Sequence, residues 1–252
     1  MIYNELLNKY IMRVKEVYRE CPCHISNTNI KECLDINNMY GSDADCIKNE
    51  IRICLNDEDK EWAVFHELEH IRTAKNIYGS MVCGVMEECE LDVGGFLGTA
   101  LNEAITDFSV RKLLKRDTNK ISYAETKLFV KKICVMLNIS ENDLINAYNT
   151  KNPTIIQSYF KKLNLNIKEY YDLLANLDLF HKYHIDDIIN SVKNQNTNYV
   201  KKLKIINSTE TIKYRRFLKL KINNILKSAL KNKLISDSEF ILRLNLINQL
   251  NI

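Results

Sequence analysis

The spacing of apolar residues predicts helices along most of the chain and one strand near its beginning. Residues 50–56 alternate apolar and polar side chains, the pattern of a strand with one buried face. Apolar residues recur at helical spacing over 61–76, 99–114 and 122–139. A longer stretch, 207–233, has the same spacing and predicts one amphipathic helix. Its apolar positions include Ile212, Phe217, Leu220, Ile225 and Leu226.

Glycine and proline mark where the helical part begins. Five of the six glycines fall between residues 79 and 98, and Pro153 is the only glycine or proline after Gly98. Because these two residues are the least compatible with a helix interior, residues 99–252 are expected to be almost wholly helical. Ser140 followed by Asp143 predicts a capped helix start. The glycine-rich segment 79–98 is open to three interpretations, as a lid, a hairpin or an inhibitory plug.

These patterns predict an α+β fold that is predominantly α. A small N-terminal β-sheet and the helix that follows it would lie in residues 1–117, and a helical region would occupy residues 118–252. The two parts differ in charge: the first has 14 Lys and Arg against 21 Asp and Glu, and the second has 22 against 11. Either the basic C-terminal helices bind an acidic partner or nucleic acid, or they form a solvated surface.

The chain shows no secretory signal pattern and no apolar run of membrane-spanning length, so a cytoplasmic protein without membrane contact is expected. Seven of the eight cysteines precede residue 90. Without an export signal, free thiols are the favoured interpretation. Cys21, Cys23 and His24 form a second candidate metal group, but they lack the usual C-x2-C spacing and a second half.

The candidate chemistry lies in the helix predicted over 61–76. His66-Glu67-Leu68-Glu69-His70 is an HExxH motif, and residues four apart share one helical face. Both imidazoles can therefore reach one Zn²⁺ ion, while Glu67 can contact water as a general base. Catalytic zinc takes a third protein ligand. Glu103 and Asp107, also four apart on a predicted helix, follow His70 after a gap of 32 residues. One carboxylate can bind zinc while the other accepts the free N–H of a ligand histidine.

The two motifs resemble those of the gluzincins, the thermolysin-like clan of zinc peptidases, over residues 50–117. The resemblance implies one zinc per chain bound by His66, His70 and Glu103. It also implies that Glu67 is the general base and that Asp107 orients a ligand histidine. The clan commonly places a Tyr or His against the tetrahedral intermediate, and the candidates here are Tyr78, His181 and His184. No GxMEN-type segment precedes HExxH, which argues against an aminopeptidase.

The expected activity is hydrolysis of peptide bonds in a peptide or protein substrate. An extended substrate could pair with the strand at residues 50–56. Three alternatives stay open. The motifs also fit, more loosely, the regulatory intracellular metallopeptidases of the ImmA/IrrE type. The chain could instead be a catalytically inactive metal-binding module, although Glu67 is intact. The third alternative gives the main function to the basic C-terminal helices.

Overall fold

The computed structural model describes residues 2–33, 42–54, 59–77, 80–89, 95–117, 124–195, 205 and 207–250, and confirms an α+β fold that is predominantly α. All strands in the described part of the chain precede residue 98. The helices are α1 (Ile2–Tyr18), the 3₁₀ helix η1 (Cys23–Asn27), α2 (Lys60–Thr73), α3 (Thr99–Leu114), α4 (Ala124–Leu137), α5 (Glu141–Asn149), α6 (Thr154–Lys162), α7 (Ile167–Gln195), α8 (Thr209–Lys231) and α9 (Asp237–Gln249). The strands are β1 (Asn29–Cys33), β2 (Asp43–Asp45), β3 (Glu50–Cys54), β4 (Ala74–Ile77), β5 (Ser80–Cys83), β6 (Glu87–Cys89) and β7 (Gly95–Leu97).

Two compact units make up the folded chain. The first contains residues 1–84, 105–119 and 149–151, and the second contains residues 85–104, 120–148 and 152–252. Helix α3 is continuous and belongs to both. A separate domain spanning residues 1–117 stays a prediction from the sequence.

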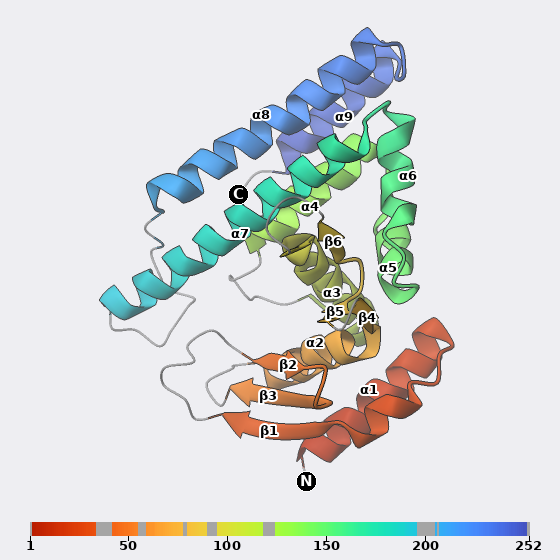
Figure 1. Cartoon of the computed structure of the whole chain (residues 1–252), viewed down its shortest axis with the longest axis vertical. Helices are drawn as coiled ribbons and strands as arrows, with labels where there is room; N and C mark the ends of the chain where they lie inside the picture. Colours follow the sequence, from red (N-terminus) through yellow and green to blue (C-terminus); the bar gives the residue numbers. More distant parts are fainter. Residues whose placement is uncertain are drawn as a thin grey trace. The chain divides into compact units, whose positions relative to one another are not determined.

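The first unit is built on a three-stranded sheet in the order β1-β3-β2 (Figure 1). β1 runs parallel to β3, with Ile30 opposite Ile51, and β2 runs antiparallel to it, with Ala44 opposite Ile51. The strand predicted over 50–56 is therefore the central strand and pairs on both sides. The expectation that it binds an extended substrate was wrong, because its backbone groups already bond to β1 and β2. Among the described strands of this sheet, β1 and β2 form the edges.

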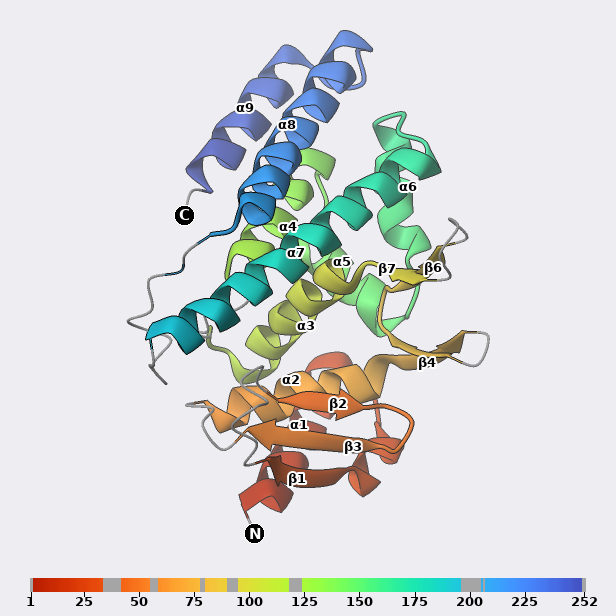
Figure 2. The same ribbon diagram turned by 60° about the vertical axis from the view of Figure 1, so that its left-hand side comes forward.

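One face of this sheet is covered by helices α1 and α2, which lie behind it in Figure 2. Ile51 and Ile53 of β3 are fully buried on the covered face, whereas Arg52 between them is exposed. This is the alternation that the sequence showed. Tyr10 of α1 and Phe65 of α2 join the same core, with their rings edge to face at a centroid distance of 5.2 Å.

Residues 74–97 form two pairs of antiparallel strands. β4 pairs with β5, and β6 pairs with β7. The helix predicted over 61–76 therefore ends earlier, at Thr73, where Ala74 turns the backbone into β4. Strand pairing gives most of the glycine-rich segment a hairpin-like structure. Tyr78, Gly79 and residues 90–94 lie outside the described residues.

Apart from the β6–β7 pair the described part of the second unit is helical, and after Gly98 the scarcity of glycine and proline predicted this. Helices α7, α8 and α9 pack side by side (Figure 2). Ser140 and Asp143 bond reciprocally at the start of α5, as predicted. The apolar positions of α8 divide: Ile225 and Leu226 are buried, but Leu220 is 62 % exposed. Phe217 and Ile212 are also exposed, so only part of the predicted apolar stripe faces the core.

No helix in the described part of the chain has both the length and the apolar composition needed to cross a membrane.

Candidate metal centre

Helix α2 carries the HExxH motif through the interior of the first unit. Asp59 caps its start by accepting a hydrogen bond from the backbone N–H of Trp62. Every residue from Trp62 to Thr73 is buried. A helix that is buried on all sides cannot turn its polar side chains to water, so their polar groups must find partners inside the protein.

The two imidazoles of the motif meet at their ring nitrogens. Nε2 of His66 and Nε2 of His70 are 3.1 Å apart, and both side chains are buried. Two nitrogen ligands bound tetrahedrally at about 2.0–2.1 Å from one zinc ion would lie roughly 3.3 Å from each other. The separation in the structure is therefore close to the one that a shared ion requires.

Asp107 of α3 fixes the orientation of the His66 ring. Its Oδ1 lies 3.0 Å from His66 Nδ1 and 3.2 Å from the indole Nε1 of Trp62. The indole N–H can only donate, so the Asp107 oxygen accepts. The same oxygen accepts from His66 Nδ1–H, which leaves the lone pair of Nε2 directed toward His70. The sequence predicted that Asp107 would contact a ligand histidine in this way, and its role in orienting a zinc ligand stays a prediction.

Glu103 lies one helical turn before Asp107 on α3. Ligand atoms of His66, His70 and Glu103 all lie within 4.8 Å of one another, and Glu103 is only half-buried. Two imidazole nitrogens and one carboxylate oxygen are a donor set that suits a divalent cation. The structure thus brings together the three predicted ligands in a group that can hold a metal ion. The residue types and their geometry fit zinc among the divalent cations.

The start of α3 is held by a residue far away in the sequence. Asp178 of α7 accepts hydrogen bonds from the backbone N–H groups of Gly98 and Ala100, at 2.8 and 2.7 Å. Burial raises the pKa of Asp178 to about 6, although these backbone bonds oppose the shift. Asn102 accepts from the backbone N–H of Val85 and so ties this turn of α3 to the preceding chain.

Glu67, the predicted general base, lies beside His66 on α2 and is 6 % exposed. The pKa of the nearby Cys46 thiol is lowered, mainly by a hydrogen bond with Cys83 and less by His70. The charge of Glu67 opposes this shift and raises the pKa of the same thiol. A buried carboxylate next to the candidate ligands can take up a proton from water at the site.

The three candidates for stabilising the reacting group are in different situations. Tyr78 lies outside the described residues. His181 is half-buried and its Nδ1 lies 2.9 Å from Thr126 Oγ1. Burial lowers the pKa of His181 and the nearby Glu103 raises it, so this ring is within electrostatic reach of a candidate ligand. His184 is buried and stacked on Phe180, and its charged neighbours are Glu125, Arg215 and Asp187.

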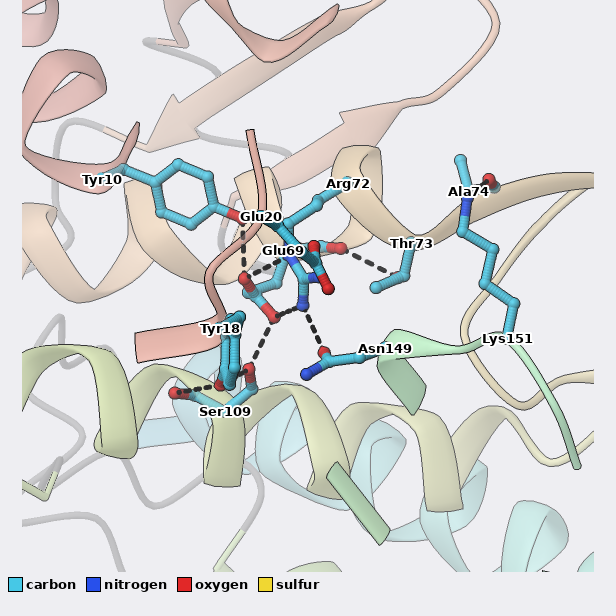
Figure 3. A network of polar contacts seen from close by, with 10 residues as sticks. All are labelled: Tyr10, Tyr18, Glu20, Glu69, Arg72, Thr73, Ala74, Ser109, Asn149 and Lys151. Atoms are coloured by element: carbon cyan, nitrogen blue, oxygen red, sulfur yellow. Dashed lines mark hydrogen bonds and ion pairs between the residues drawn. The ribbon is translucent and has the colours of Figure 1, made fainter. Parts of the chain in front are cut away.

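Glu69, inside the same motif, belongs to a separate polar network (Figure 3). It is fully buried, and Arg72 donates to both of its oxygens at 2.9 and 2.7 Å. Burial alone would raise the pKa of Glu69, but the Arg72 guanidinium and two hydroxyl groups hold it below its ordinary value. Four further side chains bond directly to Glu69 or Arg72, and they are Tyr10, Glu20, Ser109 and Asn149.

Sequence reasoning missed two side chains that position the candidate ligands. Trp62 precedes His66 by four residues, so the helical spacing could have indicated that both face Asp107. Asp178 comes 71 residues after Asp107, and no local pattern marks it as the residue that holds the start of α3.

Comparisons with protein-family models, with curated proteins and with solved structures find no match to this chain. The candidate centre is therefore supported by its own residues and geometry.

Proposed function

We propose that the chain is a zinc-dependent peptidase. The observation that carries the proposal is the convergence of His66, His70 and Glu103, with Asp107 hydrogen-bonded to the outer nitrogen of His66. Glu67 adds the side chain that distinguishes a catalytic HExxH site from a purely structural one. The resemblance to gluzincins supports the same activity, and the regulatory ImmA/IrrE type is the alternative within the class.

Each residue has a role in this mechanism. Zinc at the site would polarise a peptide carbonyl and make water more acidic. Glu67 takes a proton on its carboxylate as water attacks the carbonyl carbon, and then transfers that proton to the leaving amine nitrogen. Asp107 keeps the His66 proton on Nδ1. His181 is the favoured candidate for donating to the developing oxyanion, because it lies near Glu103.

An extended peptide is the favoured substrate. β2 is an edge strand among the described strands of its sheet, and it packs against α2, the helix that bears the motif. Backbone groups on such an edge can add a further strand supplied by a peptide. The edge strand β2 thus replaces β3 as the proposed docking strand.

The first test is the metal content of the purified protein. We expect about one zinc per chain in the wild type and a loss in His70→Ala and Glu103→Ala. His24→Ala is the matched control, because His24 is exposed and belongs to the rival Cys21-Cys23 group. Zinc lost in His24→Ala but retained in the other two variants would place the metal elsewhere and refute the proposed centre.

The second test separates a peptidase from an inactive metal-binding module. Glu67→Gln should retain zinc and cleave a library of unstructured peptides about 10²–10⁴-fold more slowly, the usual contribution of a general base. Cleavage at the wild-type rate would exclude Glu67 as the base.

The basic C-terminal helices do not favour a second function. Arg215 pairs with Glu125, and Tyr214 stacks on Tyr183, so parts of this surface are engaged within the unit. Binding of an acidic partner or nucleic acid stays a prediction. We propose the cytoplasm as the compartment, because the seven cysteines with described side chains are free thiols.

A further inference from the structure

Two cysteines lie side by side next to the HExxH helix. The Sγ atoms of Cys46 and Cys83 are 3.7 Å apart, and both side chains are half-buried. Cys46 Sγ also lies 3.8 Å from the backbone oxygen of His70. The thiols are thus near enough to bond after a small movement and exposed enough for a small reagent to reach them.

Local structure holds both cysteines in place. Cys46 follows β2 in a turn, where the Asp45 carboxylate accepts from the backbone N–H groups of Ile47 and Lys48. Cys83 ends β5 directly opposite Ala74, the first residue after α2. The two thiols therefore sit at the ends of the segment 46–83, which contains the whole of α2.

We propose that Cys46 and Cys83 form a reversible disulfide by exchange with a low-molecular-weight disulfide, at a redox site beside the candidate metal centre. A thiolate of the pair attacks one sulfur of the reagent, forms a mixed disulfide and releases a small thiolate. The second cysteine then attacks the protein sulfur and releases the other small thiolate. The two protein thiols lose two electrons, the reagent gains them, and both protons pass to the released thiols.

The bond closes the segment around α2 into a loop. A cross-link of this kind stabilises the fold chiefly by restricting the unfolded chain. Disulfides of intracellular proteins are commonly transient and redox-sensing. A half-buried pair fits this role better than that of a permanent structural disulfide.

A second pair supplies the competing interpretation. Cys21 and Cys23 are exposed and their Sγ atoms lie 3.2 Å apart, so they can also react with an oxidant. They flank Pro22 only, and a bond between them would not enclose α2. The double variant Cys21→Ser/Cys23→Ser removes this competitor and is the background for the stability experiment.

The test is a titration of wild type with mixtures of oxidised and reduced glutathione, followed by alkylation and peptide mapping by mass spectrometry. We expect a Cys46–Cys83 peptide whose amount follows the glutathione ratio and which dithiothreitol removes. A pair that stays reduced, stops at glutathione adducts or bonds to other cysteines would overturn the proposal. The peptide map detects the disulfide directly, so the experiment gives an answer whether or not the protein contains zinc.

Thermal unfolding gives an independent measurement. In the Cys21→Ser/Cys23→Ser background, oxidation should raise the Tm by about 5–15 °C. Adding Cys83→Ser should abolish that rise, and an equal rise in this triple variant would contradict the assignment. Wild-type mapping keeps the test valid if a serine variant folds poorly.

The consequence for the metal rests on the proposed function. Fixing the ends of the segment that carries His66 and His70 suppresses local opening, so oxidised protein should lose zinc to a chelator several-fold more slowly. Equal release rates in both redox states would refute this regulatory role. A protein without zinc would instead refute the proposed function and leave the mapped disulfide in place.

Discussion

Helix α2 carries two buried polar clusters, and their polar groups are compensated in different ways. Glu69 bonds through both oxygens to Arg72, so a negative and a positive charge compensate each other inside the first unit. His66 and His70 instead bring two imidazole nitrogens within 3.1 Å, next to a carboxylate on α3. The first cluster supplies its own cation, whereas the second has the donor atoms that a cation would bind.

Because of this difference, one helix can contribute to stability and also carry a group that can hold a metal ion. The Glu69 network joins α1, α2 and α3, because its members include Tyr10 and Ser109 (Figure 3). It fixes the two helices that carry the candidate ligands. Two nitrogen lone pairs that face each other repel unless a proton or a metal ion lies between them. The histidine pair is therefore the cluster whose stability depends on binding a proton or a metal ion.

The largest expected effect comes from breaking the self-compensated cluster. Arg72→Met leaves the fully buried Glu69 without its guanidinium, and should lower the free energy of unfolding by about 3–5 kcal/mol. Urea denaturation measures it. Arg116→Met is the control, since Arg116 is exposed and binds Asp59 and Glu61 at the surface; its loss should cost less than about 1 kcal/mol. Equal losses would mean that burial does not distinguish the two ion pairs.

A metal should stabilise the protein through the histidine cluster only. At zinc concentrations about 100-fold above its Kd, ligand binding adds about 2.7 kcal/mol to the free energy of unfolding. Denaturation with and without zinc should show this gain in wild type and no gain in His70→Ala. Arg72→Met should keep most of the gain although it starts from a lower stability. Full stabilisation of His70→Ala by zinc would show that the metal binds at another group.

A smaller effect should follow when the support of His66 is weakened. Asp107→Asn removes the charged acceptor of His66 Nδ1–H, and should weaken zinc binding by about 10–100-fold. Trp62→Phe removes the other donor to the same oxygen but leaves the His66 contact, so its effect on zinc affinity should be smaller. Competition with a chromogenic chelator measures both. If Trp62→Phe weakens binding as much as Asp107→Asn, general packing rather than ring orientation controls affinity.

Local patterns in the sequence were enough to predict most residues of the candidate site. HExxH specifies its own geometry because residues four apart share a helical face, and the same argument pairs Glu103 with Asp107. Glycine content likewise predicted the helical second half. The sequence could not show that the strand 50–56 is central, because alternation of apolar residues reports a buried face and says nothing about neighbours on either side.

Contacts between distant segments were beyond these patterns. Asp178 holds the start of α3, and Cys83 lies beside Cys46, yet neither contact follows from helical or strand spacing. The end of α2 was also placed too late, since Ala74 to Asn76 have a helix-compatible composition and enter β4 only because β5 pairs with them. Tertiary pairing overrides a weak local preference in such cases.

The smallest effect should come from His184, a buried imidazole outside both clusters. No hydrogen-bond partner for its ring nitrogens lies within the described residues, and it stacks on Phe180 at a centroid distance of 5.6 Å. Burial lowers its pKa, so the folded state binds the proton less readily than the unfolded state. The stabilising contribution is present above the ordinary histidine pKa and is lost as the pH falls through the lowered value.

His184→Phe removes this titration while keeping a ring of similar shape. At pH 7 the free energy of unfolding should change by less than about 1.5 kcal/mol. Between pH 7 and pH 5 the variant should lose less stability than wild type, as measured by urea denaturation at each pH. An unchanged pH dependence would mean that His184 finds a partner for its proton, and that this ring belongs with the compensated cluster of Glu69 rather than apart from it.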